Sequence, residues 1–253
     1  MTETTAAPTV ALIHGAFADN SGWNGVIAGL TAAGIRAQGI SNPLRGISYD
    51  AAYVASALGQ IPGPVIAVGH SYGGAVITNA GMRPGNVVAL VYVAAFAPDE
   101  GETLLEIESG STDSVLNSAL VQLKYPTGQG EETQTEFAIA EDRFHDAFAA
   151  DVPPADSALM WATQRPVSAL AFGEKNGVPA WRSLPCWAVV ATGDKAAGSD
   201  VVRKMAQRAG MTISEVEGSH VAFVTKPEPV VDAIMAAVQQ VGRGAVGRSP
   251  AAV

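Results

Sequence analysis

Cysteine, charged residues and aromatic residues are all scarce in this sequence. Cys186 is the single cysteine among 253 residues, which excludes an intrachain disulfide framework and a zinc cluster built from cysteines. Its surroundings, "LPCWAVVATG", predict a small buried residue at the start of a strand. No apolar stretch reaches 18 residues, and no basic segment followed by an apolar one opens the chain. We therefore expect a cytoplasmic protein that does not associate with membranes.

Positive charge is also scarce. The chain has 15 Lys and Arg against 24 Asp and Glu, which gives a net charge of −9. The average field of such a protein repels a phosphate backbone, so nucleic-acid binding is not expected. Only 15% of residues are charged and 48% are apolar, a composition typical of a compact globular protein. The sequence lacks a metal-binding cysteine cluster and the Gly-Lys-Ser/Thr of a phosphate loop, so we expect no metal and no cofactor.

What the chain does contain is a regular alternation of strand and helix patterns. Six β-branched apolar runs are separated by segments with helical spacing: "TVALIHG", "IRAQGI", "PVIAVGH", "NVVALVYVAA", "CWAVVATG" and "MTISEVEG". Parallel strands need crossover helices and are buried on both faces. The alternation therefore predicts an α/β fold with a doubly wound, mostly parallel six-stranded sheet.

This rhythm stops between residues 98 and 184, where helical spacing occurs in pieces and no strand is evident. We expect a helical lid insertion over the carboxyl ends of the strands, where such sheets bind ligands. Residues 1–97 and 185–242 would then form the core domain, and the glycine-rich residues 243–253 a flexible tail. Six aromatic residues of the insertion are candidates for the roof of a substrate pocket: Phe137, Phe144, Phe148, Trp161, Phe172 and Trp181.

The segment "VIAVGHSYGG" places Ser71 between Gly69 and Gly73. With 27 glycines in the chain, a Gly-x-Ser-x-Gly match arises easily by chance, so the flanking segments must decide. An apolar run precedes Ser71 and a helical pattern follows it, which is the sharp strand-to-helix turn that exposes a nucleophilic hydroxyl. The context therefore predicts that Ser71 is a nucleophile.

A serine nucleophile needs a base and an orienting acid, and in this kind of fold they follow it in the order acid, histidine. His220 comes after the last predicted strand and is the expected base. His14 and His70 precede the acid-bearing segments, and His145 lies in the insertion, so these three are not favoured.

Three aspartates at strand ends compete for the role of the acid. Asp194 directly follows the strand "CWAVVATG" and is the preferred residue. Asp99 follows the strand "NVVALVYVAA" and is the first alternative, whereas Asp200 stands where a helix N-cap belongs, a position that capping alone explains.

An oxyanion hole would use the backbone N–H that follows the nucleophile and a second N–H from a loop after an earlier strand. Tyr72 supplies the first, and Ala16, in the turn "LIHGAFADNSGW", supplies the second, with Phe17 as the alternative donor. We expect His14 to brace this turn by hydrogen bonding. Phe17, His14, Trp161 and Phe137 are the residues expected to line the substrate pocket.

Five motifs in this order, "HGAFADNSGW", "GHSYGG", "VYVAAFAPDEGE", "ATGDKA" and "GSHVAFVTKPEPV", make the chain resemble the α/β-hydrolase superfamily. The likeness is strongest to small bacterial serine hydrolases similar to plant methyl esterases and hydroxynitrile lyases, and it runs from about Val10 to Val238. The resemblance implies a triad of Ser71, Asp194 and His220. Ala191 stands where the family's turn before the acid usually has glycine, and "KAAG" replaces its usual Ile-Pro ending.

The resemblance implies a carboxylesterase-type hydrolase that cleaves a small or medium ester through an acyl-enzyme on Ser71. Two alternatives remain. Hydroxynitrile lyases share the triad but have a threonine and a lysine where this chain has Gly15 and Val221, and a receptor could bind a ligand with the same residues without turning it over. The expected partner is a small-molecule ester, and the sequence leaves the oligomeric state open, with a homodimer as one option.

Overall fold

The computed structural model describes the backbone of residues 7–246 and the side chains of residues 7–243. Its centre is a six-stranded sheet with the strand order β2-β1-β3-β4-β8-β9, in which every pair of neighbours is parallel. The predicted fold class is therefore confirmed. The strands are β1 (Thr9–Ile13), β2 (Ala37–Ile40), β3 (Val65–His70), β4 (Val87–Val93), β8 (Cys186–Ala191) and β9 (Thr212–Val216).

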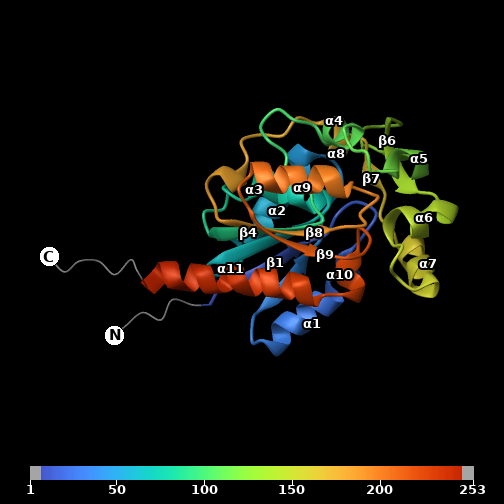
Figure 1. The fold of residues 1–253 in the computed structure, drawn as a ribbon. Coiled ribbons are helices and arrows are strands. Elements are labelled where there is room, and N and C mark those ends of the chain that lie inside the picture. Colours follow the sequence, from blue (N-terminus) through green and yellow to red (C-terminus); the bar gives the residue numbers. More distant parts are fainter. Residues whose placement is uncertain (1–6, 247–253) are drawn as a thin grey trace.

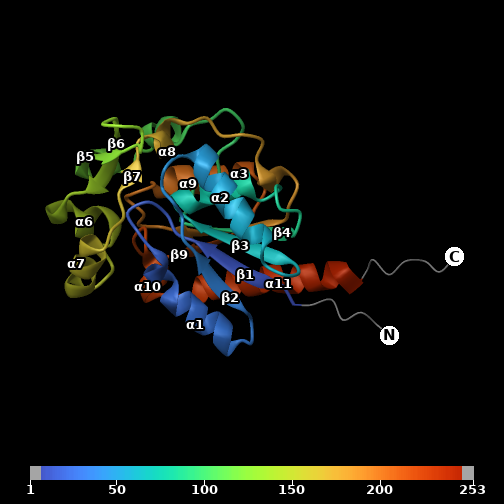
Figure 2. The same ribbon diagram turned by 180° about the vertical axis from the view of Figure 1, so that it is seen from behind.

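Helices cover both faces of this sheet (Figures 1 and 2). One face carries α1 (Asn24–Ala32) and α11 (Glu228–Val246). The other carries α2 (Ile47–Gly59), α3 (Tyr72–Ala80) and α9 (Ser199–Arg208). Every residue of β1 and β3 is buried, as expected of central parallel strands covered on both faces. Short helical turns at η1 (Asn20–Trp23) and α10 (Ala222–Thr225) flank the carboxyl edge.

The order of the strands indicates where a ligand would bind. The connection from β1 leads to β2 on one side, and the connection from β3 leads to β4 on the other side, so the chain changes direction along the sheet between β1 and β3. Open α/β sheets bind ligands outside the carboxyl ends of the strands at such a switch point. His14 directly follows β1 and Ser71 directly follows β3, so both lie at this crevice.

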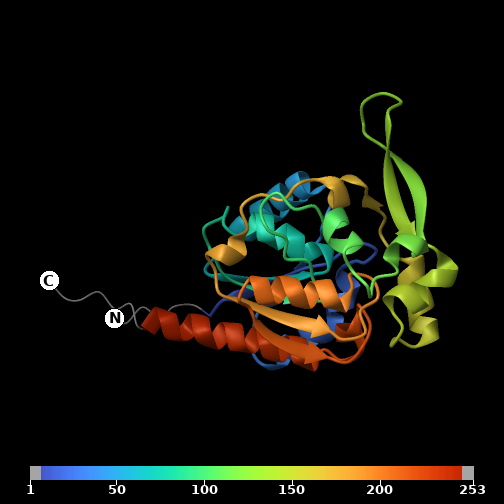
Figure 3. The same cartoon turned by 45° about the horizontal axis from the view of Figure 1, so that its top comes forward.

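The insertion at residues 98–184 contains strands as well as helices, so the expectation of a purely helical segment is wrong. Its sheet has the order β5-β6-β7, and β5 and β6 form an antiparallel hairpin that projects from the body of the molecule (Figure 3). The elements are α4 (Leu104–Ser109), α5 (Leu116–Ala119), β5 (Leu120–Pro126), β6 (Thr133–Ile139), α6 (Glu141–Phe148), α7 (Pro154–Ala162), β7 (Val167–Ser168), α8 (Leu170–Gly173) and η2 (Ala180–Arg182).

Three smaller expectations concern the ends of the chain and its cysteine. Helix α11 continues through Val246, so the tail expected from residue 243 begins within a helix, and residues 247–253 lie outside the described range. Cys186 is only partly buried, yet burial raises the pKa of its thiol to about 12, which keeps the sulfur protonated and unreactive. No helix within residues 7–246 is both long and apolar enough to cross a membrane.

Candidate functional site

Ser71 occupies a strained turn between β3 and α3. Its backbone has φ 52° and ψ −124°, in the left-handed half of the map that non-glycine residues rarely adopt. The glycines on either side are required sterically, because a Cβ on Gly69 would lie 2.5 Å from the Gly73 carbonyl oxygen, and one on Gly73 would lie 2.5 Å from the Ile13 carbonyl oxygen. This is the geometry of a nucleophile elbow, which presents a serine side chain at the sheet edge.

Asp194 and His220 meet in the interior behind this edge. His220 Nδ1 lies 2.8 Å from Asp194 Oδ2, and both side chains are 1% exposed. The other carboxylate oxygen, Oδ1, accepts hydrogen bonds from the backbone N–H groups of Ala196 (2.9 Å) and Ala197 (3.0 Å). A carboxylate can only accept, so Nδ1 carries the ring proton and Nε2 is left as the acceptor.

The two competing aspartates are engaged elsewhere. Asp99 forms an ion pair with Arg182, and Asp200 accepts hydrogen bonds from the side chain of Ser111 and the backbone of Thr112. The structure therefore brings Asp194, and neither of the alternatives, to His220.

His70 links the serine turn to the histidine loop. Its Nε2 donates to the carbonyl oxygen of His220 at 3.0 Å, and the centroids of the two rings are 4.6 Å apart. Burial holds the pKa of His70 well below its usual value, so this imidazole is neutral. Ser71 Oγ makes no hydrogen bond to a described residue, and such bonds often tighten only when substrate is bound. The predicted nucleophile and base thus lie on loops that are bonded to each other.

The turn after β1 packs directly on the serine. A Cβ on Gly15 would lie 2.6 Å from Ser71 Cβ, so only glycine fits there. Phe17 has φ 59°, and its N–H donates to the carbonyl oxygen of Arg165 at 3.2 Å. The N–H of Ala16 has no partner among the described residues, and that of Tyr72, at the first position of α3, has no acceptor within the helix. Ala16 and Tyr72 are therefore available as the predicted oxyanion donors, whereas Phe17 is not.

His14 braces this turn in its neutral form. Its Nδ1 donates to the carbonyl oxygen of Gly15 at 2.9 Å, which leaves Nε2 to accept from the N–H of Asn42 (3.0 Å) and from Nη1 of Arg165 (3.1 Å). Burial is the main cause that lowers the pKa of His14 to about 4; the Gly15 hydrogen bond raises it and the Arg165 charge lowers it. His14 thus has the hydrogen bonds expected of a bracing residue.

The side chain of Tyr72 points away from the serine. Its hydroxyl donates to Asp50 Oδ2 at 2.7 Å, and both residues are buried. Burial raises the pKa of the Asp50 carboxyl, and the hydrogen bonds that it accepts from the Arg45 backbone and from Tyr72 lower this pKa by less than burial raises it. Tyr72 therefore offers the site only its backbone N–H, and the buried hydrogen bond to Asp50 fixes where that N–H lies.

Two insertion residues complete the surroundings of His220. Phe148, at the end of α6, packs on the imidazole with ring centroids 5.0 Å apart. Asp151 accepts from the N–H of Ser219 (3.0 Å) and from the hydroxyl of Thr225 (3.1 Å), and so holds the loop that carries His220. Phe148 was among the predicted roof aromatics, whereas nothing in the sequence around Asp151 indicates its role. His145 lies on the outer side of α6, with 39% of its side chain exposed.

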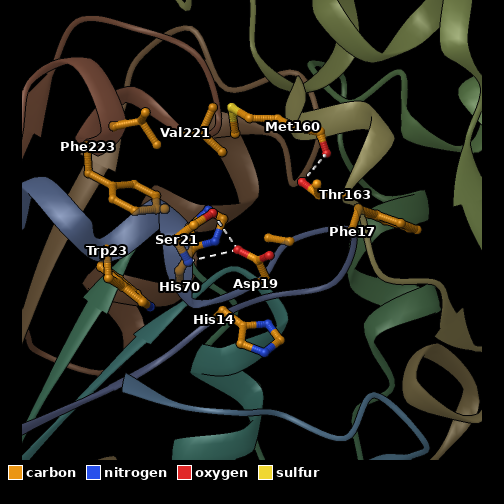
Figure 4. Close-up of a pocket in the computed structure, with 13 residues that line it drawn as sticks. His14, Phe17, Asp19, Ser21, Trp23, His70, Met160, Thr163, Val221 and Phe223 are labelled. Carbon is orange, nitrogen blue, oxygen red and sulfur yellow. Dashed lines mark hydrogen bonds between the residues drawn. The ribbon is translucent and has the colours of Figure 1, made fainter. Parts of the chain in front are cut away.

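The four predicted pocket residues do not share one cavity. His14 and Phe17 line a narrow cavity of about 20 Å³ together with Met160 and Val221 (Figure 4). Phe137 lines a separate apolar cavity of about 420 Å³ between the insertion sheet, α4 and α8, and Trp161 lines a third of about 190 Å³ between α6 and α7. The expectation that these four residues line one pocket is therefore wrong, because Phe137 on β6 and Trp161 on α7 face other cavities within the insertion. Within residues 7–246, no three His, Cys, Asp or Glu side chains are grouped to hold a metal ion.

Solved structures similar to this one are α/β proteins of the same overall fold. A pyrethroid hydrolase from Sphingobium faniae has a TM-score of 0.71 and 22% identity, with 92% of this chain and 98% of that chain covered. A polyneuridine aldehyde esterase has a TM-score of 0.75 and 18% identity, with 93% and 99% covered. Tomato methylketone synthase I, solved as a variant with β-ketoheptanoate, has the same TM-score, identity and coverage.

A comparison with curated protein sequences finds no match. The model of the alpha/beta hydrolase family, in contrast, matches residues 10–233, which include both parts of the six-stranded sheet, the serine turn and the histidine loop. This chain therefore belongs to the alpha/beta hydrolase family.

Proposed function

We propose that this hydrolase cleaves a small or medium carboxylic ester through an acyl-enzyme on Ser71. The observation that carries the proposal is the buried hydrogen bond of 2.8 Å between His220 Nδ1 and Asp194 Oδ2. The carbonyl oxygen of His220 also accepts a hydrogen bond from His70, the residue before Ser71. Ser71, Asp194 and His220 follow one another in the chain order Ser, Asp, His that is typical of serine hydrolases of this fold.

In this mechanism Ser71 Oγ attacks the ester carbonyl carbon while His220 Nε2 takes the hydroxyl proton. Asp194 keeps the Nδ1–H tautomer in place and stabilises the imidazolium that forms. The N–H groups of Ala16 and Tyr72 donate to the oxyanion. The bond from the carbonyl carbon to the alcohol oxygen then breaks, and His220 gives its proton to the leaving alcohol. A water molecule, deprotonated by His220, attacks the acyl-enzyme; the bond to Ser71 Oγ breaks, Oγ takes the proton back from His220, and the acid is released.

The surroundings of the base favour hydrolysis over cyanohydrin cleavage. Val221, directly after His220, is 1% exposed and apolar, so no cation stands there to hold a departing cyanide. The names of two similar structures, a pyrethroid hydrolase and a polyneuridine aldehyde esterase, are consistent with ester hydrolysis.

The first test is Ser71→Ala, assayed with p-nitrophenyl acetate. We expect kcat/KM to fall by about 10⁴-fold or more, since the nucleophile is lost. Ser118→Ala, which removes an exposed hydroxyl from the insertion, is the control and should match the wild type. Activity retained in Ser71→Ala would overturn the proposal, and saturable thermal stabilisation by an ester with no product formed would favour a receptor instead.

A further inference from the structure

Arg165, in the segment between α7 and β7, joins the insertion to the turn that carries the predicted oxyanion donor. Its carbonyl oxygen accepts the N–H of Phe17 at 3.2 Å. Its Nη1 donates to His14 Nε2 at 3.1 Å and to the carbonyl oxygen of Asn42 at 2.7 Å. We call residues 14–17 the oxyanion turn. One residue of the insertion is thus bonded to both ends of this turn.

Among the side chains of residues 7–243, no carboxylate pairs with the guanidinium of Arg165. Guanidinium stays protonated at any working pH, and no carboxylate of a described residue lies within 4.0 Å of that of Arg165. Its strongest contacts are with neutral acceptors, and His14 Nε2 is one of them. Because a single lone pair of this nitrogen meets the N–H groups of both Arg165 and Asn42, the contact persists only while His14 is neutral.

The chain of contacts continues from His14 to the serine. His14 Nδ1 donates to the Gly15 carbonyl oxygen at 2.9 Å, and Gly15 packs against Ser71 Cβ with no room for a side chain. The peptide that follows this carbonyl carries the Ala16 N–H. Fixing the Gly15 carbonyl therefore fixes the plane of the peptide whose N–H would face the oxyanion.

The bond from Phe17 to Arg165 acts on the next peptide, which joins Ala16 to Phe17. By accepting the Phe17 N–H, the Arg165 carbonyl holds Phe17 at φ 59°, a conformation that costs free energy unless neighbouring contacts impose it. This bond does not use the Ala16 N–H, which has no partner among the described residues.

We propose that Arg165 is a positioning residue that holds the oxyanion turn in its donor geometry. The proposal rests on the proposed function, because the turn matters only if an oxyanion forms on Ser71. Arg165 does not touch the reacting atoms. Its side chain acts through His14, whereas the bond to Phe17 comes from its main-chain carbonyl and is kept when the side chain is replaced. Misplacement of a preorganised donor weakens binding of the transition state more than binding of the substrate.

The test compares Arg165→Gln and Arg165→Lys with the control Arg143→Gln. Arg143 is an exposed arginine of α6 in the same insertion, so its replacement changes the net charge equally. We expect Arg165→Gln to lower kcat by about 10- to 100-fold with KM changed less than about threefold, a part of what loss of a whole donor costs. Arg165→Lys keeps a charged donor and should restore part of kcat, and Arg143→Gln should match the wild type.

A second readout does not need turnover. Phenylboronic acid forms a tetrahedral adduct with a serine nucleophile, and its oxygen occupies the oxyanion position, so its Kd reports the donor geometry directly. We expect the Kd, measured by calorimetry, to rise in Arg165→Gln by a factor similar to the loss in kcat. The NMR titration of the His14 ring should also move toward higher pH in this variant, because the cation that opposes protonation is gone.

The outcomes separate the two proposals. If the wild type binds phenylboronic acid no better than Ser71→Ala, the proposed function fails, and the role of Arg165 fails with it. If binding depends on Ser71 but Arg165→Gln keeps the wild-type kcat and Kd, or loses no more than Arg143→Gln, only the role of Arg165 is overturned. Should Arg165→Gln fail to fold, Arg165→Met, which keeps an unbranched side chain and removes the charged donor, carries the test, and a wild-type kcat and Kd in that variant would overturn the role.

Discussion

His14, His70 and His220 each donate one hydrogen bond from a ring nitrogen, and the acceptor of that bond distinguishes His220 from the other two. His220 donates from Nδ1 to a buried carboxylate, whereas His14 and His70 donate to backbone carbonyl oxygens. A carboxylate stabilises the imidazolium that forms during proton transfer, and a carbonyl does so far less. Burial lowers the pKa of His14 and His70, which keeps them neutral and suits them to bracing loops. The local contacts therefore favour His220 over His14 and His70 as the proposed base.

Asp194→Asn tests this assignment at the residue scale. The amide oxygen can take the place of Oδ1, which accepts the N–H groups of Ala196 and Ala197, so the amide nitrogen faces His220. That nitrogen donates and forces the proton of His220 onto Nε2, the atom that must accept from Ser71. We expect the variant to fold and kcat to fall by about 10⁴-fold with the same ester.

Asp99→Asn is the matched control for this variant. It removes a carboxylate that pairs with Arg182 at the surface, and it should leave kcat unchanged. An equal loss of activity in both variants would contradict the assignment of Asp194.

At the scale of elements, the sequence was informative where one local pattern decides the structure. The β-branched runs around β1 and β3 predicted their strands because a central parallel strand is apolar on both faces. The hairpin of the insertion was missed although a signal exists: "TQTEFAI" contains two threonines, a phenylalanine and an isoleucine, which favour a strand, and Gly128 and Gly130 mark a turn before it.

The sequence could not predict the contacts that Asp151 and Arg165 make with segments far away in the chain. The order Ser, Asp, His predicted a candidate site because the strand ends of a parallel sheet meet at one edge. Asp151 binds a backbone N–H at Ser219, and Arg165 binds His14. Neither contact leaves a local pattern, since each depends on how the insertion folds back over the core.

Asp151→Ala tests the link between the insertion and the histidine loop. The Ser219 N–H and the Thr225 hydroxyl would lose their acceptor, so the loop that orients His220 should loosen. We expect the free energy of unfolding to fall by about 1–2 kcal/mol and kcat to fall by about tenfold, which is the size of effect expected from a slightly misplaced base.

The readouts for Asp151→Ala are urea unfolding and ester hydrolysis at a fixed pH. Asp232→Ala removes an exposed carboxylate from α11 and should change neither quantity. A wild-type kcat in Asp151→Ala, despite a loss of stability, would show that the clamp is not needed to position the base.

For the whole molecule, two buried neutral histidines make stability depend on pH. His14 has a pKa of about 4 when folded, against about 6.5 when unfolded, and the folded pKa of His70 is also lowered. Between these values the unfolded chain binds more protons, so stability is full above about pH 6.5 and falls as the pH drops toward 4. The raised pKa of Asp50 acts in the opposite direction, but only where that carboxyl begins to protonate.

We therefore predict that the free energy of unfolding decreases on acidification from about pH 7.5 to about pH 5.5, by up to about 1.4 kcal/mol per pH unit for each buried histidine. Urea unfolding measures it, at pH values above the isoelectric point of about 4.8 so that aggregation does not interfere. His14→Gln should be less stable at neutral pH, because a braced turn is lost, yet show a smaller slope with pH. An unchanged slope in His14→Gln would mean that His14 does not titrate on unfolding.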